Sequence, residues 1–498
     1  MELVALVKHD CPTCDQLLPA LTAAAQRGAP VRILSQSGER ETSEQAARVG
    51  LTMIPELDVD LALSERLDPD AVPAVVLFDG GAETDRVEGL QRDRLIELFE
   101  AAGATLDAGD LPAMRPGCAS VTRDPAVAAA IAARRARAEG RIRSRILRIG
   151  GLEDPVEALY DRGLTDGLPV VPPTPERVVA MLEHSARDPQ DVVAVLPPYG
   201  GIATIEKVAV NAVMAGCAGP ELPIVLAAVE AVGREDFALH GLLATTHPAG
   251  PVLVVSGPYV EQAGMRAEVN ALGQGCRATL CTGRALQLTV RNVGGGRPGV
   301  EDRATHGSPA KVGFSFAERL DAGAPFGGLA QDRAGLAAEE TGVTAFAGEA
   351  PRLVADQLAR DPESLAASLA EGLEQVSSIR FRLAFDAMLV LGPEHGRVFR
   401  EAGWSRAQLQ LALHQASHRP AGEIVRGAGG IAEGLDPAWV TDPAFPVAKF
   451  ASPDRILIAY AGGDAGLFSM VIGGWVSGEI GSAPQTARVE DWLRPGRS

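Results

Sequence analysis

Short apolar runs and amphipathic stretches alternate through the first hundred residues. Leu3 to Val7 is a run of strand-forming residues, and the stretch from Gln16 to Arg27 is rich in leucine and alanine, which favour a helix. Between them lies Cys11-Pro-Thr-Cys14. The pattern predicts a β-strand that leads through a cysteine-containing turn into a helix. Farther on, it predicts a strand at Ala74 to Phe78 and a helix at Asp93 to Ala102.

The two cysteines of this turn are candidates for redox chemistry. A cysteine at a helix N-terminus meets free N–H groups and the positive end of the helix dipole, which favour the thiolate. We therefore expect Cys11 to attack disulfides and Cys14, three residues later, to resolve the mixed disulfide. The alternatives are a zinc half-site or a structural pair, but a closed zinc site needs four ligands and only His9 lies nearby.

The order of these elements resembles that of thioredoxin over residues 1–102. Pro73 stands directly before the strand Ala74 to Phe78, and an Asp-Gly-Gly turn follows it. The resemblance implies that Pro73 is a cis proline opposite the dithiol, where it shapes a groove for an extended substrate. Two features depart from the family: Cys-Pro-Thr-Cys is closer to the glutaredoxin motif, and Leu51 to Asp70 lengthens the spacing to Pro73. The redox potential is therefore open.

Residues 103–151 are predicted to join the first domain to the rest of the chain. Ala104 to Asp124 contains prolines and small residues and is interpreted as a linker, whereas Ala126 to Arg148 is predicted to be an arginine-rich helix. Cys118 lies in the linker. It is either a relay thiol between the dithiol and a second site or an inert, locally packed cysteine.

Residues 152–498 alternate strand-forming runs with alanine-rich stretches, which is typical of an α/β domain. A break in the pattern at 327–342 is a candidate boundary between two lobes of this region. Val252 to Pro258 and Met388 to Pro393 are both predicted strands that end in Gly-Pro, which hints at an internal duplication. The predicted fold class is thus α/β, with a thioredoxin-like domain followed by a larger α/β region.

Two stretches of this region resemble an uncharacterised bacterial family that is sometimes fused to thioredoxin-like domains. They are Thr204 to Cys217 and Asn292 to Gly299. The resemblance implies no activity, so the candidate residues come from the sequence itself. Lys207 and Asn211 share one face of a predicted helix at i, i+4 spacing. A buried Lys207 would serve as base, Schiff-base former or carboxylate clamp, and an exposed one would form a solvated ion pair.

A glycine-rich loop is predicted to open a helix that starts after Cys276, where N–H groups hold an anion or activate a thiol. Cys276 is therefore the candidate second-site thiol. Arg277 and Arg284 follow at heptad spacing as candidates for binding a carboxylate or phosphate, or as a solvated stripe.

A polar loop follows this helix and carries three more candidates. Asp302 and Lys311 are candidate substrate-binding residues, and His306 between them is a candidate general acid or base. A surface loop without function is the alternative, since one histidine and one aspartate specify no metal.

Charge and cysteine content restrict the function further. The net charge of -18 and the pI of about 5.0 oppose binding to nucleic acid or anionic membranes, and no apolar run is long enough to span a bilayer. Six cysteines are too few for a disulfide scaffold, and the N-terminus lacks the pattern of a secretory signal. We expect a cytoplasmic protein.

The leading hypothesis is a thiol-dependent oxidoreductase, whose dithiol exchanges electrons with a small, anionic substrate or with a thiol held by the larger region. Its cofactor is the redox-active disulfide itself, and an external thiol is the expected reductant; the sequence specifies no metal. Alternatively, the larger region is a lyase or hydrolase, with or without a metal, that the redox domain regulates or keeps reduced. A third hypothesis is a binding module.

Overall fold

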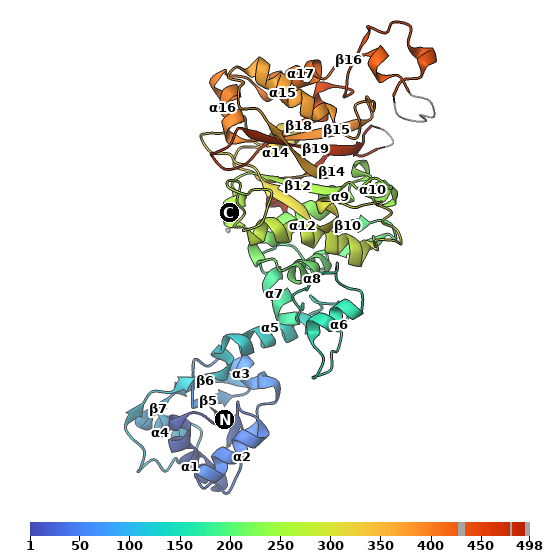
Figure 1. Ribbon diagram of the computed structural model, residues 1–498. Helices are drawn as coiled ribbons and strands as arrows, with labels where there is room; N and C mark the ends of the chain where they lie inside the picture. Colours follow the sequence, from blue (N-terminus) through green and yellow to red (C-terminus); the bar gives the residue numbers. More distant parts are fainter. Residues whose placement is uncertain (427–433, 479–480, 494–498) are drawn as a thin grey trace. The chain divides into compact units, whose positions relative to one another are not determined.

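The computed structural model describes residues 1–426, 434–478 and 481–493. The chain divides into two compact units, which we call the first domain (Met1–Arg135) and the second domain (Ala136–Ser498) (Figure 1). The division falls between the boundaries predicted at 102/103 and 151/152. The further division near 327–342 stays a prediction.

The first domain is built on a five-stranded sheet with the order β3-β2-β1-β5-β6. β1 pairs in parallel with β2 and antiparallel with β5, and β5 pairs antiparallel with β6. The strands are β1 (Glu2–Val7), β2 (Val31–Ser35), β3 (Glu56–Leu57), β5 (Ala74–Asp79) and β6 (Ala82–Glu88). This topology confirms the predicted thioredoxin-like fold of the first domain.

Helices cover this sheet and complete its core. They are α1 (Pro12–Gln26), α2 (Glu39–Arg48), α3 (Ala62–Leu67) and α4 (Arg92–Ala101). The apolar face of α1, with Leu17 and Leu21, and that of α4, with Leu98 and Phe99, are buried in one cluster with β1 and β5. The structure starts α1 at Pro12, earlier than the predicted Gln16, because Cys11 caps the helix and proline suits its first turn.

The structure differs from the expected linker over residues 114–119. Here β8 (Met114–Arg115) pairs with β7 (Leu90–Gln91), and β9 (Cys118–Ala119) pairs with β4 (Ala71–Val72). The segment is therefore held by backbone pairing within the first domain. The predicted arginine-rich helix is also shorter than expected: it is α5 (Pro125–Ala138), and Gly140 follows with a positive φ of 72°.

A seven-stranded sheet forms the centre of the second domain, with the order β13-β12-β14-β19-β15-β18 and with β20 paired to β14. Its strands are β12 (Gly250–Ser256), β13 (Phe314–Ala317), β14 (Gly342–Ala355), β15 (Phe385–Leu391), β18 (Ile456–Tyr460), β19 (Phe468–Val476) and β20 (Gln485–Arg488). Two short pairs lie outside it: β10 (Val192–Leu196) with β11 (Gly201–Thr204), and β16 (Arg419–Pro420) with β17 (Pro446–Val447).

Helices pack on this sheet, and in Figure 1 it lies between α15 to α17 and the group that contains α9 and α12. The helices of the second domain are α6 (Pro155–Asp161), α7 (Pro175–Leu182), α8 (Ile205–Ala215), α9 (Leu222–Gly233), α10 (Leu239–Ala244), α11 (Tyr259–Gln262), α12 (Arg277–Thr289), α13 (Pro309–Val312), α14 (Leu329–Ala334), α15 (Pro362–Glu374), α16 (Pro393–Glu401) and α17 (Arg406–Ala416). Together with the sheet they confirm the predicted α/β region.

The sheet repeats one arrangement twice. β12 pairs in parallel with β13 and antiparallel with β14, while β15 pairs in parallel with β18 and antiparallel with β19. β14 and β19 pair with each other at the centre. β12 and β15 are the two strands that precede Gly257-Pro258 and Gly392-Pro393. The topology thus supports the duplication that these sequences suggest.

The buried carboxylate of Glu318 connects β13 and β18, the two edge strands of the sheet. Glu318 follows β13, and its Oε2 accepts hydrogen bonds from Ser256 Oγ and Leu329 N, both at 2.5 Å. Its Oε1 accepts one from the backbone N–H of Tyr460, at the end of β18. Burial raises the pKa of this carboxyl group. Because β13 and β18 lie at opposite ends of the order, the sheet curves until its edge strands approach each other.

None of the helices among the described residues combines the length and apolar character that a membrane span needs.

Substitution of Phe99 should destabilise the first domain by roughly 3–5 kcal/mol, because Phe99→Ala leaves a cavity in its core. All four tryptophans, Trp404, Trp439, Trp475 and Trp492, lie in the second domain. In urea, we expect the variant to show an earlier far-ultraviolet circular dichroism transition but an unchanged tryptophan fluorescence transition. Coincident early transitions by both probes would contradict separate unfolding of the two domains.

Candidate functional site

The first candidate site lies at the N-terminus of α1. Cys11 caps this helix, and its Sγ accepts a hydrogen bond of 3.2 Å from the backbone N–H of Cys14. The same Sγ lies 3.4 Å from the carbonyl oxygen of Val72, the residue before Pro73. The Val72–Pro73 peptide is cis, as the resemblance implies. The structure therefore brings Cys11, Cys14 and Pro73 together.

The two thiols of the motif have opposite acidities. A hydrogen bond from the Cys14 side chain is the largest influence on Cys11 and, against the effect of burial, lowers the pKa of its thiol to about 5; hydrogen bonds from Cys118 lower it further. Burial is the main cause that raises the pKa of Cys14, and the hydrogen bond and negative charge of Cys11 raise it further. At neutral pH, Cys11 is consequently a thiolate, and Cys14 is the thiol that stabilises it.

Cys118 brings a third thiol to this site. In the β4–β9 pair, Cys118 lies opposite Val72, whose carbonyl oxygen is 3.4 Å from Cys11 Sγ, and Cys118 packs against the buried cluster that contains Cys11. Burial, followed by the hydrogen bond to Cys11, raises the pKa of the Cys118 thiol. We call Cys11, Cys14 and Cys118 the thiol cluster. The predicted relay role of Cys118 stays a prediction, but the residue lies beside the nucleophile.

The sequence contains a signal for this contact in the glycine before Cys118. A Cβ at Gly117 would lie 2.8 Å from the carbonyl oxygen of Val72 and 2.9 Å from Cβ of Ala71. Only glycine therefore fits where the segment crosses β4. A glycine in a flexible linker would have no such constraint. The sequence alone therefore does not distinguish a glycine required by the contact with β4 from an ordinary linker glycine.

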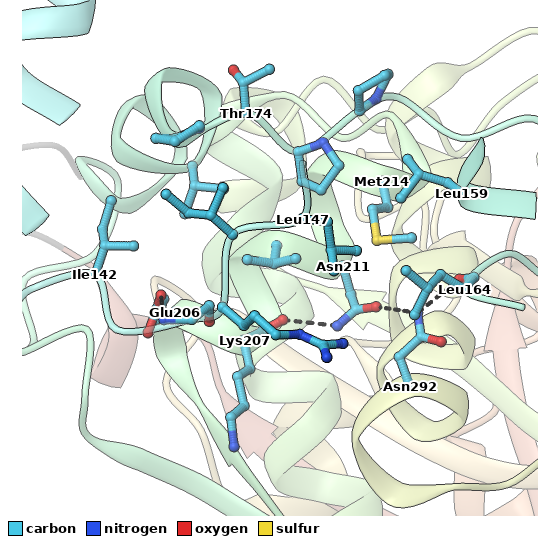
Figure 2. Close-up of a pocket in the computed structure, with 18 of the residues that line it drawn as sticks. Ile142, Leu147, Leu159, Leu164, Thr174, Glu206, Lys207, Asn211, Met214 and Asn292 are labelled. Carbon is cyan, nitrogen blue, oxygen red and sulfur yellow. Dashed lines mark hydrogen bonds between the residues drawn. The ribbon is translucent and has the colours of Figure 1, made fainter. Parts of the chain in front are cut away.

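A cavity of about 400 Å³ in the second domain is the other candidate site (Figure 2). Its wall is mostly apolar, and it combines residues of α6, α7 and α8 with the segment 142–149. Labelled apolar residues are Ile142, Leu147, Leu159, Leu164 and Met214. Lys207 and Asn211, predicted to share one face of a helix, both line this cavity from α8.

The polar side chains of the cavity form hydrogen bonds with neighbouring protein groups. Asn211 is buried; its Nδ2 donates to the carbonyl oxygen of Lys207 at 2.9 Å, and its Oδ1 accepts from Asn292 Nδ2 at 2.8 Å. Asn292 Oδ1 is buried and has no hydrogen-bond partner among the described residues. Lys207 is exposed, and its Nζ donates to the carbonyl oxygen of Ile202 at 2.8 Å. The burial that a lysine base requires is therefore absent.

Sequence analysis did not assign Glu206 to this site. Its Oε1 accepts from the backbone N–H groups of Arg143 and Ser144 at 3.0 and 2.8 Å, and its Oε2 accepts from Gln190 Nε2 at 2.9 Å. Glu206 thus fixes the segment that forms one wall of the cavity. A helix wheel places it away from Lys207, and its partners are distant in sequence, so no local pattern indicates this role.

The predicted second-site thiol lies at the start of α12. Cys276 precedes the helix and is half-buried, and its Sγ donates to the carbonyl oxygen of Gly264 at 3.1 Å. Arg277 is exposed and lies 3.8 Å from Glu221. Arg284 forms two hydrogen bonds with Asp166, at 2.7 and 2.8 Å. Anion binding by the two arginines stays a prediction, and at Arg284 a ligand would compete with Asp166.

The polar loop after α12 holds Asp302, His306 and Lys311. Asp302 Oδ1 forms an ion pair of 3.1 Å with Lys311 Nζ, and both side chains are largely buried. His306 is exposed in the same loop. The structure therefore pairs Asp302 with the lysine rather than with the histidine. In the described ranges, no three His, Cys, Asp or Glu residues are grouped so that they could hold a metal ion.

No family model and no curated protein match this chain. A secreted Mycobacterium tuberculosis disulfide oxidoreductase homologous to E. coli DsbE matches with 17% identity and a TM-score of 0.18, covering 20% of this chain and 80% of that one. StoA from Bacillus subtilis matches with 14% identity and a TM-score of 0.18, covering 20% and 81%. The thioredoxin-like assignment rests on the strand order and on Pro73 beside the dithiol.

Alkylation by iodoacetamide should measure the ionisation of Cys11, because only the thiolate reacts. We expect a rate that is half-maximal near pH 5 and falls below it as the thiolate gains a proton. Cys14→Ala removes the strongest stabilising hydrogen bond, so its midpoint should lie at higher pH. Mass spectrometry of the Cys11 peptide gives the rates. A wild-type midpoint near the ordinary value of 9.0 would contradict the geometry.

Proposed function

We propose that the first domain is a thiol-disulfide oxidoreductase. The observation that carries this proposal is the lowered pKa of Cys11, at the N-terminus of α1 and in hydrogen-bond contact with Cys14. A thiolate is the nucleophile in disulfide exchange, and a second thiol three residues later lies within its reach.

The reaction consists of two exchanges. The Cys11 thiolate attacks one sulfur of a disulfide, forms a mixed disulfide and releases the other sulfur as a thiolate. Cys14 then loses its proton and attacks Cys11, which releases the second thiolate and leaves a Cys11–Cys14 disulfide. The substrate gains two electrons, and the protein loses two. An external thiol reverses the change in the protein.

Formation of the mixed disulfide helps to activate Cys14. In the resting protein, the hydrogen bond to Cys11 and its negative charge both raise the pKa of Cys14. Once Cys11 is bound in a disulfide, its charge is gone and only burial and weaker effects remain. The order of the two exchanges therefore follows from the electrostatics of the pair.

We further propose that the second domain supplies the substrate or the partner thiol of this reaction. Two domains in one chain meet at an effective concentration that a linker sets, which favours exchange between them. Cys276 is the candidate thiol, because it is only half-buried and precedes the N-terminus of α12. Arg277 and the loop with His306 and Lys311 remain candidates for holding a small anionic substrate.

The cavity of the second domain supports a small-molecule site. Its apolar wall suits the apolar body of a small molecule. We propose this cavity as the place where a small substrate binds.

Replacement of Cys11 should abolish reduction of a model disulfide by the prereduced protein. In a stopped-flow assay with the dye disulfide DTNB, we expect Cys11→Ser to lose the fast phase of thiolate release. The matched control, Cys276→Ser, should keep it, because that phase belongs to the first domain. A fast phase that survives in Cys11→Ser and disappears in Cys276→Ser would refute the assignment of the nucleophile.

Filling the cavity should weaken binding of an apolar anion. Val210 lines the cavity and is half-buried, so Val210→Phe places a ring in the space without replacing a core residue. We expect lower fluorescence enhancement of anilinonaphthalene sulfonate than in wild type. Leu411→Phe, at an exposed position on α17, is the control and should bind the dye as wild type does. Equal enhancement in all three proteins would exclude the cavity as the dye site.

A further inference from the structure

The partner of Cys11 in a disulfide must occupy a restricted place. Its Cα has to lie within about 4.4–6.8 Å of that of Cys11, with the two Cβ atoms turned toward each other. In the first domain this place adjoins β4, because Cys11 Sγ lies 3.4 Å from the carbonyl oxygen of Val72. A peptide that carries the partner cysteine can bind there by adding a strand to β4.

The chain's own β9 already occupies that position. It runs antiparallel to β4 and sets Cys118 opposite Val72. The residue that Cys11 contacts is thus the one that Cys118 faces. Cys118 also packs against the buried cluster that contains Cys11 and Cys14, and Cys11 and Cys118 each shift the pKa of the other.

Contacts on both sides fix the segment in this register. Before Cys118, the hydroxyl of Thr13, inside the dithiol motif, donates to the carbonyl oxygen of Pro116 at 2.8 Å. After it, the backbone N–H of Ser120 donates to Asp70 O at 3.0 Å. The buried Gln36 donates to Ser120 Oγ at 2.9 Å and accepts from the N–H of Val121 at 3.0 Å. These contacts hold residues 116–121 in a fixed position beside the dithiol.

We propose that Cys118 is a second resolving thiol, which attacks the mixed disulfide on Cys11 and forms a Cys11–Cys118 disulfide. This inference rests on the proposed function of Cys11 as the nucleophile, and it adds a third catalytic residue to that function. It also favours small disulfides as substrates, since β9 covers the edge of β4 that an extended peptide would use.

The electrons balance as they do for Cys14. The Cys118 thiol gives up its proton to water and attacks Sγ of Cys11; the bond between Cys11 and the substrate sulfur breaks, and that sulfur leaves as a thiolate. The substrate disulfide has then gained two electrons, and Cys11 and Cys118 have lost two. Cys14 can afterwards attack Cys11 and release Cys118, which converts one internal disulfide into the other without further oxidation.

Burial distinguishes the two resolving thiols. Cys14 is fully buried, whereas Cys118 is partly exposed. Desolvation opposes formation of a thiolate at both, but it acts more strongly on the fully buried one. Cys118 is therefore the thiol that water reaches more easily when a proton has to leave.

The test uses full-length protein without Cys14, treated with one equivalent of DTNB per protein. In Cys14→Ser, Cys11 takes one half of DTNB and releases the other; attack by Cys118 then releases the second half. We expect two coloured thiolates per DTNB and a Cys11–Cys118 disulfide in the peptide map. The double variant Cys14→Ser, Cys118→Ser should release one and keep a stable adduct on Cys11.

The outcomes separate this inference from the proposed function. A stable adduct on Cys11 in the single variant Cys14→Ser would overturn the role of Cys118 but leave Cys11 as the nucleophile. Absence of any reaction at Cys11 would overturn both. A second release that persists in the double variant would also overturn the inference, because another thiol would then be the resolving group.

A glycine substitution tests the geometry with all thiols of the Cys14→Ser background retained. Gly117→Ala forces its Cβ against Val72 and Ala71, so it should displace Cys118 and slow the second release by at least about tenfold. Gly109→Ala is the matched control in the same segment, since its Cβ would meet only Asp107 Oδ1 at 3.9 Å. Equal second-phase rates in the two variants would show that the observed register of β9 does not matter for the reaction.

Discussion

The antiparallel pairing of β9 with β4 is the interaction on which the proposed role of Cys118 depends. It joins only two residues on each side, yet it sets the position of a thiol relative to a nucleophile more than 100 residues away in sequence. The pairing requires a glycine at position 117, and the dithiol motif itself anchors it through Thr13. A site that resembles an open thioredoxin-like groove in sequence is thus closed along β4 by its own chain.

In the second domain, the central constraint is the pairing of β14 with β19. Each of these strands belongs to one copy of the repeated three-stranded arrangement, and their contact joins the copies into one sheet. A further contact between the copies lies at the sheet edges, where Glu318 accepts the N–H of Tyr460. The cavity with Asn211 lies outside this repeat, on α6 to α8, so binding there and the fold of the sheet involve different parts of the sequence.

Sequence patterns predicted those helices and strands that are long enough to show their own periodic pattern of apolar residues. The strand predicted at Ala74 to Phe78 is β5, which ends at Asp79, and the helix predicted at Asp93 to Ala102 is α4, Arg92–Ala101. The strands β4 and β9 escaped prediction because two-residue strands have no periodicity and exist only through each other. The environment of Arg284 depends on Asp166, a partner 118 residues away in sequence that no local pattern indicates. The helix after the first domain was overestimated because alanine and arginine favour helix on both sides of Gly140.

The odd number of thiols in the cluster limits what oxidation can do to it. Three sulfurs can form one disulfide at a time, so one of them always remains reduced. If Cys118 resolves disulfides as proposed, oxidised protein is a set of isomers that differ in which sulfur is left over, and these interconvert without any external electron acceptor. A fully oxidised cluster keeps a nucleophile, unlike a dithiol, whose oxidation consumes both of its thiols.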